Sequence, residues 1–389
     1  MRARKLSEVC QIIMGQSPKG SSYNQNQVGM PLLNGAADYK GQNFTPNQYT
    51  SEPTRIAKQG DIIFGVRATI GNFAIVDKDY CIGRGVSAIR VNEELVLKEY
   101  IIRFVKKEIE KLKNKASGST IKGIKKEDLT KMKINLPPLE TQKQIAQILD
   151  NAAALRDKTK QLLTEYDALA QSIFLDMFGD PVVNPKEWET KTIEKLVLKE
   201  KGSIKRGPFG GALKKEIFVN EGYLVYEQYH ALNNDFDFER YYIDDNHFKK
   251  LKGFEVKPGD IIISCSGVYL GKLAIIPENA KKGIINQALL KITLDECKMR
   301  KEFFVFHFTQ ENFRIKYFDA NRGAGIPNFP PMSSFKKFPF VIPPIEVQNE
   351  FVEKLKLIEQ QKELAKQELK ESEDLFNCLL QKAFKGELV

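Results

Sequence analysis

The chain repeats one ordered set of motifs, and this repeat limits the possible folds more than any other feature of the sequence. Residues 60–64 read Gly-Asp-Ile-Ile-Phe and residues 259–263 read Gly-Asp-Ile-Ile-Ile, and each copy continues to a glycine and an apolar run. Leu-Pro-Pro-Leu-Glu-Thr-Gln at 136–142 recurs later as Ile-Pro-Pro-Ile-Glu-Val-Gln at 342–348. The copies lie much further apart than the roughly 20–50 residues of a solenoid repeat. We therefore expect a duplicated module, with one domain and one helix in each copy.

Each copy begins with a segment that is typical of a mixed α/β domain. Short apolar runs such as 62–64 and 261–263 are predicted to be buried strands, separated by turns rich in glycine and proline. Basic helices are expected at 98–113 and, in the second copy, at 300–317. The predicted class is α+β, a pseudo-two-fold repeat with mixed α/β domains at 1–136 and 181–342 and long helical segments at 137–180 and 343–389.

The segments that follow the two Pro-Pro pairs change to the 3–4 spacing of a heptad helix. Proline is tolerated at a helix start, and Gly179 and Gly386 are suitable helix stops. Each helix would contain roughly 40 residues and measure about 60 Å. Either each helix packs on its own domain or the two helices pair, and their length and duplication favour pairing, with room for other chains to share the seam. The predicted stripes are Ile145, Ile148, Ala152, Leu155, Thr159, Leu162, Tyr166, Leu169 and Ile173, and Phe351, Leu355, Ile358, Lys362, Ala365, Leu369, Ser372, Phe376, Leu379 and Ala383.

The net charge of +10 and the isoelectric point near 9.1 favour a polyanionic partner such as nucleic acid. The five cysteines form no Cys-x-x-Cys pair and the three histidines are scattered, so neither a disulfide framework nor a metal site is expected. The sequence contains no apolar run long enough to span a membrane, and its N-terminal residues do not resemble a secretory signal. A cytoplasmic protein is the expectation.

The motifs of several common enzyme classes are missing from the sequence. Residues 267–273 have the wrong spacing for a phosphate-binding loop. Residues 135–139 and 328–332 break the pattern of adenine methyltransferases, in which an acidic or amide residue precedes Pro-Pro and an aromatic. Asp295 and Glu296 are predicted to lie in a solvated turn, since a nuclease site needs clustered carboxylates. We expect no catalytic residue, metal or cofactor on this chain.

Together, the repeated blocks resemble the specificity subunit of type I restriction-modification systems over nearly the whole chain. The resemblance rests on the Gly-Asp-Ile-Ile blocks at 60–63 and 259–262 and on the Pro-Pro-x-Glu-x-Gln blocks at 137–142 and 343–348. Long helices at 139–178 and 345–384 and the Asn-Pro-Lys-Glu-Trp sequence at 184–188 complete it. The first copy has no counterpart of Trp188, and this difference concerns only the completeness of its first strand.

The resemblance implies two target recognition domains that each read one half of a split DNA site. In that family the long helices form an antiparallel coiled coil that spaces the domains and docks two modification (methyltransferase) subunits, and restriction (translocase-nuclease) subunits complete the complex. S-adenosylmethionine and ATP with magnesium are then expected only on the partner subunits. The isolated chain could self-associate through its helices. Four residues inserted after Thr159 should change the gap between the half-sites and leave their sequences unchanged.

Candidate DNA contacts lie in glycine-flanked turns and basic loops. Lysine and arginine can bind phosphates, and arginine, asparagine, glutamine and serine can read base edges. The candidates are Arg67, Thr69, Arg84, Thr120, Lys122, Lys125, Lys205, Arg206, Ser266, Tyr269, Asn286, Gln287 and Arg322.

Three other interpretations are open from the sequence. The same subunit could serve a methylation-only or fused-nuclease system. A coiled-coil adaptor with two protein-binding lobes would bind no DNA in a salt-dependent way. A stand-alone nuclease would cleave DNA with metal as the purified chain.

Overall fold

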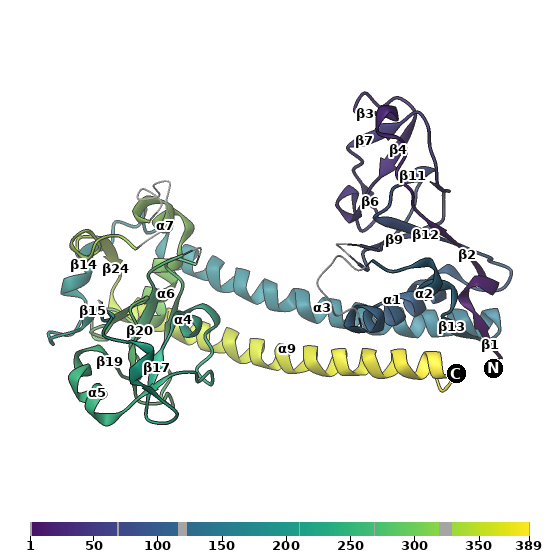
Figure 1. The fold of residues 1–389 in the computed structure, drawn as a ribbon. Coiled ribbons are helices and arrows are strands. Elements are labelled where there is room, and N and C mark those ends of the chain that lie inside the picture. The colour runs from purple at the N-terminus through teal and green to yellow at the C-terminus, as the bar shows by residue number, and fades with distance from the viewer. Residues whose placement is uncertain are drawn as a thin grey trace. The chain divides into compact units, whose positions relative to one another are not determined.

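The computed structural model describes residues 2–67, 70–115, 123–209, 211–267, 269–318 and 329–388. The chain divides into two compact units. Unit 1 comprises Met1–Gln161 together with Ala365–Val389, and unit 2 comprises Leu162–Leu364. The boundaries fall inside the two long helices, so each unit contains one globular module and a part of each helix (Figure 1).

Unit 1 is built on three main sheets. A ribbon pairs β1 with β13, a four-stranded antiparallel sheet has the order β10-β9-β12-β2, and a five-stranded mixed sheet has the order β3-β7-β4-β11-β8. Strands β5 and β6 form a small hairpin beside them. The strands are β1 (Arg2–Lys5), β2 (Cys10–Met14), β3 (Tyr23–Asn24), β4 (Met30–Leu33), β5 (Tyr39–Lys40), β6 (Asn43–Phe44), β7 (Gln48–Thr50), β8 (Ile56–Ala57), β9 (Ile62–Gly65), β10 (Phe73–Ile75), β11 (Tyr80–Ile82), β12 (Val86–Val91) and β13 (Lys133–Leu136).

Unit 2 repeats these three sheets strand for strand. The ribbon is β14-β24, the four-stranded sheet is β21-β20-β23-β15, and the five-stranded sheet is β16-β18-β17-β22-β19. The register repeats as well, because Ile62 faces Ile89 in unit 1 and Ile261 faces Ile292 in unit 2. The strands are β14 (Glu189–Thr192), β15 (Ile204–Arg206), β16 (Phe218–Val219), β17 (Tyr223–Tyr226), β18 (Tyr242–Ile243), β19 (Glu255–Val256), β20 (Ile261–Ser264), β21 (Leu273–Ile275), β22 (Gly283–Ile285), β23 (Leu289–Ile292) and β24 (Pro339–Ile342).

The predicted α+β class and the duplication are thus confirmed at the level of sheet topology. The first strand of the first copy is complete without a tryptophan, because β1 pairs with β13 over four residues, as β14 does with β24.

The Gly-Asp-Ile-Ile motif forms a tight turn that leads into an interior strand of each four-stranded sheet. Gly60 and Gly259 have φ angles of 86° and 84°, a region that favours glycine. The carboxylates of Asp61 and Asp260 each accept a backbone N–H three residues earlier, at 2.8 Å in both units. The strands that follow, β9 and β20, are buried along their whole length, so the motif positions a core strand.

The shorter helices also follow the repeat, with one difference. The helix expected at 98–113 is α1 (Lys98–Lys115), whereas the helix expected at 300–317 is divided into α6 (Lys301–Thr309) and α7 (Glu311–Tyr317). The division falls at Gln310, whose backbone is extended and whose buried side chain donates to the Phe306 carbonyl and accepts from Gln171. The other short helices are α2 (Lys126–Thr130), α4 (Gln228–Asn233), α5 (Asp245–Lys250) and α8 (Met332–Phe335).

The two long helices are α3 (Leu139–Phe178) and α9 (Ile345–Lys385). Both end at a glycine with positive φ, Gly179 and Gly386, as predicted. In unit 1 the early part of α3 packs on the late part of α9, with the Arg156 guanidinium 5.0 Å from the Phe376 ring.

In unit 2 the late part of α3 packs on the early part of α9. Lys362 Nζ lies 2.8 Å from Asp167 Oδ1, and the rings of Phe174 and Phe351 lie 5.6 Å apart. The antiparallel pairing is therefore present in each unit.

The predicted heptad stripe on α3 is wrong at two of its nine positions, and the other seven are buried or half-buried. Leu155 and Leu169 are 45% and 46% exposed, whereas Ala153 and Ala170 are buried. Sequence periodicity favoured Leu155 because it is apolar, but the neighbouring Arg156 faces α9 and covers the Phe376 ring with its guanidinium. On α9, the members of the predicted stripe are all buried or half-buried.

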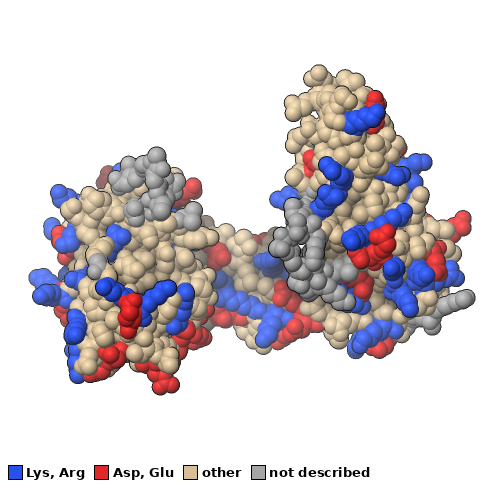
Figure 2. All heavy atoms as spheres, in the orientation of Figure 1, with Lys and Arg blue, Asp and Glu red and all other residues tan. Residues whose placement is uncertain are grey.

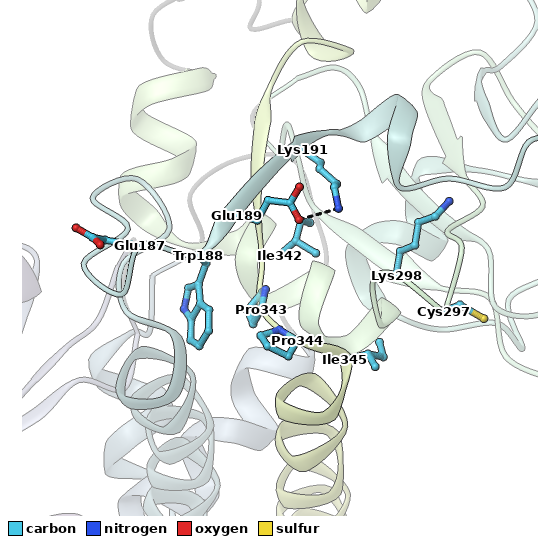
Figure 3. Close-up of a pocket in the computed structure, with 10 residues that line it drawn as sticks. All are labelled: Glu187, Trp188, Glu189, Lys191, Cys297, Lys298, Ile342, Pro343, Pro344 and Ile345. Carbon is cyan, nitrogen blue, oxygen red and sulfur yellow. Dashed lines mark hydrogen bonds and ion pairs between the residues drawn. The ribbon is translucent and has the colours of Figure 1, made fainter.

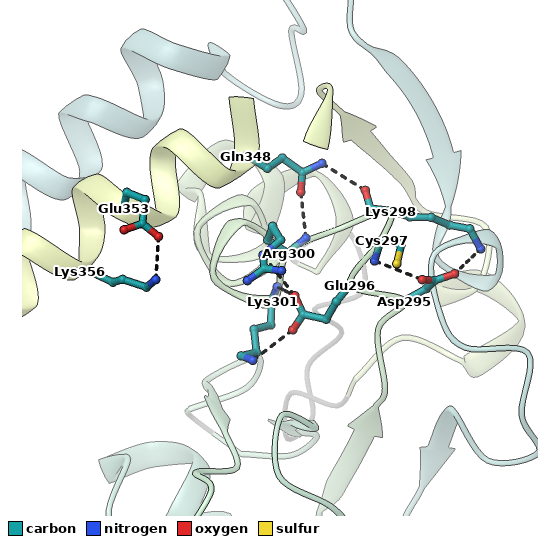
Figure 4. A network of polar contacts seen from close by, with 9 residues as sticks. All are labelled: Asp295, Glu296, Cys297, Lys298, Arg300, Lys301, Gln348, Glu353 and Lys356. Carbon is teal, nitrogen blue, oxygen red and sulfur yellow. Dashed lines mark hydrogen bonds and ion pairs between the residues drawn. The ribbon is translucent and has the colours of Figure 1, made fainter. Parts of the chain in front are cut away.

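A buried glutamine fixes the start of each long helix. Gln142 Oε1 accepts the Leu97 N–H (2.9 Å), and its Nε2 donates to the carbonyls of Leu95 and Pro137. Gln348 makes the same three bonds, to Arg300 N–H (2.9 Å) and to the carbonyls of Lys298 and Pro343. Figure 4 shows the bonds of Gln348 to Arg300 and Lys298, which join α9 to the segment that precedes α6. The glutamine of the Pro-Pro-x-Glu-x-Gln block therefore ties each long helix to its own module.

Candidate nucleic-acid interface

Several backbone segments meet at one end of the four-stranded sheet in unit 1. Gly15 N–H donates to the Val86 carbonyl (3.0 Å), and Val66 N–H donates to the Gly85 carbonyl (2.9 Å). Ile124 N–H in turn donates to the Val66 carbonyl (2.9 Å). We call residues 15–17, 66–67, 83–85 and 123–124 loop cluster 1. It brings the ends of β2 and β9 next to the turn between β11 and β12.

Two exposed arginines project from loop cluster 1. Arg67 follows β9, and Arg84 stands at the apex of the β11–β12 turn. Arg84 Nε donates to Ser17 Oγ at 3.1 Å. Both arginines were candidates from the sequence, and the fold places their segments side by side, since Val66 and Gly85 share a hydrogen bond.

Unit 2 contains an equivalent set of segments, loop cluster 2, formed by residues 207–209, 265–267, 286–288 and 329. Gly207 N–H donates to the Leu289 carbonyl (2.9 Å), Cys265 N–H to the Ala288 carbonyl (2.8 Å) and Phe329 N–H to the Cys265 carbonyl (3.0 Å). These bonds correspond one for one to the three bonds of loop cluster 1.

The side chains of loop cluster 2 differ from those of loop cluster 1. Gln287 is exposed at the apex of the β22–β23 turn, and the preceding Asn286 is half-buried, with its Oδ1 accepting the Ala288 N–H. Ser266 is half-buried, and its carbonyl accepts from Gln228 Nε2. Tyr269, just beyond this segment, is 58% exposed.

An exposed aromatic side chain in loop cluster 2 was not among the sequence candidates. Phe209 is 68% exposed, and the guanidinium of Arg206 lies 5.5 Å from its ring. The Nε atom of Arg206 is buried without a hydrogen-bond partner in the described part of the chain. A phenylalanine in a sequence is ordinarily assigned to a core, so only its exposure in the fold identifies it as a surface group.

The remaining candidates lie elsewhere or outside the described residues. Lys125 is exposed just before α2, next to loop cluster 1 in sequence. Lys205 points to the other face of its strand, with its ammonium 5.0 Å from the Phe254 ring. The candidates outside the described residues are Thr69, Thr120, Lys122 and Arg322.

Charge of both signs is distributed over each unit. On the face shown in Figure 2, Lys and Arg side chains of each unit are interspersed with Asp and Glu. The net charge of +10 is therefore not gathered into one uniform basic field on that face.

A pocket of about 500 Å³ lies where the second module begins (Figure 3). Its walls include Trp188, Pro343 and Pro344, and the charged residues Glu189 and Lys191 pair with each other at 2.8 Å. Trp188 Nε1 donates to the Phe178 carbonyl (3.0 Å), so the indole closes the C-terminal end of α3.

The acidic pair Asp295–Glu296 lies in a turn, as predicted, with each carboxylate beside a cation. Lys298 pairs with Asp295 (2.6 Å), and Lys301 pairs with Glu296 (3.2 Å), as Figure 4 shows. Among the residues that the structure describes, no group of three or more His, Cys, Asp or Glu side chains could hold a metal. No helix in the described ranges is long and apolar enough to cross a membrane.

The histidine His307 is fully buried on α6 and accepts the Val341 N–H through Nε2 (3.2 Å). Burial lowers its pKa from 6.5 to about 3, so the ring is neutral at physiological pH. Its role here is in packing and hydrogen bonding.

The family model described as "Type I restriction modification DNA specificity domain" matches residues 1–165 and 185–373. A chain assigned as the specificity subunit of the MjaX type I restriction enzyme of Methanocaldococcus jannaschii is 40% identical over 156 residues, which is 39% of this chain and 36% of that relative. The specificity subunit of the type I restriction enzyme MjaVIII from the same organism is 23% identical over 274 residues, 67% of this chain and 63% of the relative. The chain thus covers less than two thirds of either relative.

A chain solved in work on the assembly and conformational transition of the type I R-M system has the same fold. It superimposes with a TM-score of 0.67 at 17% identity, covering 100% of this chain and 98% of the other. Since the family model matches most of both repeats, the chain belongs to the type I restriction-modification DNA specificity family.

Proposed function

We propose that this chain is the DNA specificity subunit of a type I restriction-modification complex and that each unit contacts one half of a bipartite DNA target. The observation that carries the proposal is the recurrence of one loop cluster in both units with different exposed side chains. A shared backbone with unlike surfaces suits two readers of unlike sequences, because base edges are distinguished by the side chains that meet them.

The exposed groups of both clusters have the chemistry that DNA recognition requires. Arg67 and Arg84 offer guanidinium donors to phosphates or guanine, and Gln287 offers an amide to adenine. The exposed rings of Phe209 and Tyr269 can contact a thymine methyl group or stack on a base. A subunit of this kind binds and orients DNA and leaves the methyl transfer to its partners.

The long helices are proposed to space the two readers and to dock two modification subunits, with restriction subunits completing the complex. Several leucines on these helices are exposed, with 41–64% of their surface open to solvent. Exposed apolar side chains on a helix are available for a partner to cover. The leucines in this range are Leu155, Leu169 and Leu175 on α3 and Leu357, Leu364 and Leu375 on α9. S-adenosylmethionine, ATP and magnesium would bind the partners, in the cytoplasm.

Mapping of methylated adenines tests the DNA proposal. A host would carry this chain with its modification partner, and single-molecule sequencing would locate modified adenines. We expect a motif in two parts with a fixed gap, and no such motif in a host with the modification partner alone. A one-part motif, or a motif independent of this chain, would contradict the proposal. A protein-binding adaptor would give neither a motif nor salt-dependent DNA binding.

The spacer role is tested by lengthening the helices. Four residues inserted after Thr159 in α3, with a matched insertion after Ser372 in α9, add about 6 Å along each helix. This is the length of about two base pairs. Thr159 and Ser372 are both buried in unit 1, where α3 and α9 pack together. Inserting the same number of residues in both helices lets α3 and α9 pair on either side of the insertion. We expect the gap to change and the half-site sequences to stay, and an unchanged gap would refute the spacer role.

A further inference from the structure

Arg84 and Gln287 occupy the same position in the two units. Each follows a strand that pairs in parallel with its neighbour, in the registers Ile82 to Leu33 and Ile285 to Tyr226. Arg84 precedes Gly85, whose carbonyl accepts the Val66 N–H just after β9. In the same way Gln287 precedes Ala288, whose carbonyl accepts the Cys265 N–H just after β20. Residue by residue, the apex of the β11–β12 turn therefore corresponds to the apex of the β22–β23 turn.

Close backbone packing holds both turns in place. A Cβ atom on Gly15 would lie 2.1 Å from the Gly83 carbonyl oxygen, and one on Gly207 would lie 1.8 Å from the Asn286 carbonyl oxygen. In unit 1 the turn is also pressed against Asn34, whose own carbonyl oxygen would lie 2.3 Å from a Cβ on Gly85. A turn seated this closely presents its apex side chain from a fixed base, as specific contacts require.

Both apex side chains are exposed and have donors available. Arg84 Nε donates to Ser17 Oγ at 3.1 Å, which restrains the guanidinium plane, and the two terminal nitrogens make no hydrogen bond to any residue that the structure describes. Within the described residues, Gln287 makes no side-chain hydrogen bond. Each apex thus holds a planar group whose two adjacent hydrogen-bonding atoms can face a ligand.

We propose that this apex position reads one base pair in each half-site, with Arg84 selecting guanine in the half-site of unit 1 and Gln287 selecting adenine in the half-site of unit 2. An arginine fork matches O6 and N7 of guanine, and a glutamine amide matches N6 and N7 of adenine, in both cases through two bonds in the major groove. This assignment rests on the proposed function, and it specifies which residue recognises which base.

The test exchanges the two groups. Arg84→Gln and Gln287→Arg would each be made in the full chain, assembled with the modification partner, and the methylated motif would be mapped. We expect each variant to change the preference at a single pair in one half-site, by about 5- to 150-fold, the factor that corresponds to about 1–3 kcal/mol. The other half-site and the gap should stay unchanged. Lys131→Gln removes an exposed charge beside α2, where Thr130 accepts from Ser7, and should leave the motif unaltered.

The conservative variant Arg84→Lys separates base reading from charge. Lysine keeps the charge and loses the planar fork. Binding to duplexes that differ by one base pair should then lose its selectivity at that pair and keep its salt dependence. Equal weakening on every duplex would identify a phosphate contact and overturn the assignment. The assignment is also overturned if Arg84→Gln and Arg84→Lys both keep the wild-type motif. If the wild-type complex gives no two-part motif, the proposed function fails instead.

Discussion

Units 1 and 2 share their sheets, but the exposed side chains of their loop clusters differ. Loop cluster 1 exposes two arginines, whereas loop cluster 2 exposes a phenylalanine and a glutamine, with Tyr269 close by. The contacts that the units share are buried or backbone contacts: the Gly-Asp turn, the glutamine at the start of each long helix and the close glycine approaches. Duplicated modules can diverge at a surface without loss of fold when the shared contacts lie below that surface.

The turn aspartate shows that one buried requirement can be met in two ways. In unit 1 Arg90 forms two hydrogen bonds with Asp61, at 3.0 and 2.7 Å. In unit 2 the residue at that register is Thr293, which donates to Asp260, and the nearest cation is Lys291, 3.9 Å away. Burial raises the pKa of Asp260 and lowers that of Lys291. Burial therefore disfavours the charged form of both members of the pair in unit 2.

The glycines beneath the two apex turns should give the largest effects on stability. Gly15→Ala and Gly207→Ala would each place a Cβ against a carbonyl oxygen of the turn, at 2.1 and 1.8 Å. We expect each to lower the free energy of unfolding by about 3 kcal/mol or more. Calorimetry of the full chain would measure this, with hydrogen exchange to identify the affected unit.

Controls for these glycines exist in both units. Gly20 and Gly253 have open space where a Cβ would be. Their alanine variants should change stability by no more than about 0.5 kcal/mol. If Gly15→Ala and Gly207→Ala behaved like these controls, or if only one were destabilised, the equivalence of the two turns would be lost.

The glutamines at the starts of the long helices should give the next largest effects. Gln348→Ala removes the three hydrogen bonds of a fully buried side chain and leaves the Arg300 N–H without its acceptor. We expect a loss of about 2–3 kcal/mol, and the same loss for Gln142→Ala in unit 1. Gln360→Ala, at an exposed position of α9, is the control and should be nearly neutral. Denaturant unfolding checks all three, and a difference above about 1 kcal/mol between the two glutamine variants would show that the starts of α3 and α9 are fixed differently.

Acid should affect the two units unequally, because His307 in unit 2 takes the place of Phe104 in unit 1. Phe104 lies seven residues after Leu97, whose N–H donates to Gln142, and His307 lies seven residues after Arg300, whose N–H donates to Gln348. The unfolded chain protonates this histidine near pH 6.5, whereas burial lowers the pKa in the folded chain to about 3. Stability contributed by the neutral ring is therefore complete above pH 6.5 and is lost as pH falls toward 3, by about 1.4 kcal/mol for each pH unit crossed.

The variant His307→Phe makes unit 2 resemble unit 1 at this position. We expect it to lose about 1 kcal/mol at pH 7, because the Val341 N–H loses its acceptor. It should also lose less stability than wild type between pH 7 and pH 4. Equal acid sensitivity of the two proteins, measured by thermal unfolding across that range, would show that other groups govern the acid response of unit 2.

The sequence predicted the duplicated architecture because the repeated motifs are themselves structural. Gly60, Asp61 and Gln142 recur at 259, 260 and 348 because each makes a backbone contact that the fold requires. The glycine-flanked turn at Arg84 was likewise visible as a candidate surface. The exposed Phe209 was not, since hydrophobicity alone assigns an aromatic residue to a core and only the three-dimensional packing shows the absence of a cover.

The smallest effect on stability is expected at Leu155, where the predicted and observed faces of α3 differ, and the buried Leu149 serves as the comparison. Leu149 is fully buried, whereas Leu155, which periodicity assigned to the buried stripe, is 45% exposed. Leu149→Ala should lower the free energy of unfolding by about 2–5 kcal/mol, whereas Leu155→Gln should change it by less than about 0.5 kcal/mol. Chemical denaturation of the isolated chain measures both. Because Leu155 belongs to the surface proposed to dock modification subunits, Leu155→Gln should weaken assembly with the partner even though folding is unchanged. If Leu155→Gln lowered the free energy of unfolding as much as Leu149→Ala, Leu155 would lie on the buried face of α3, as the sequence periodicity predicted.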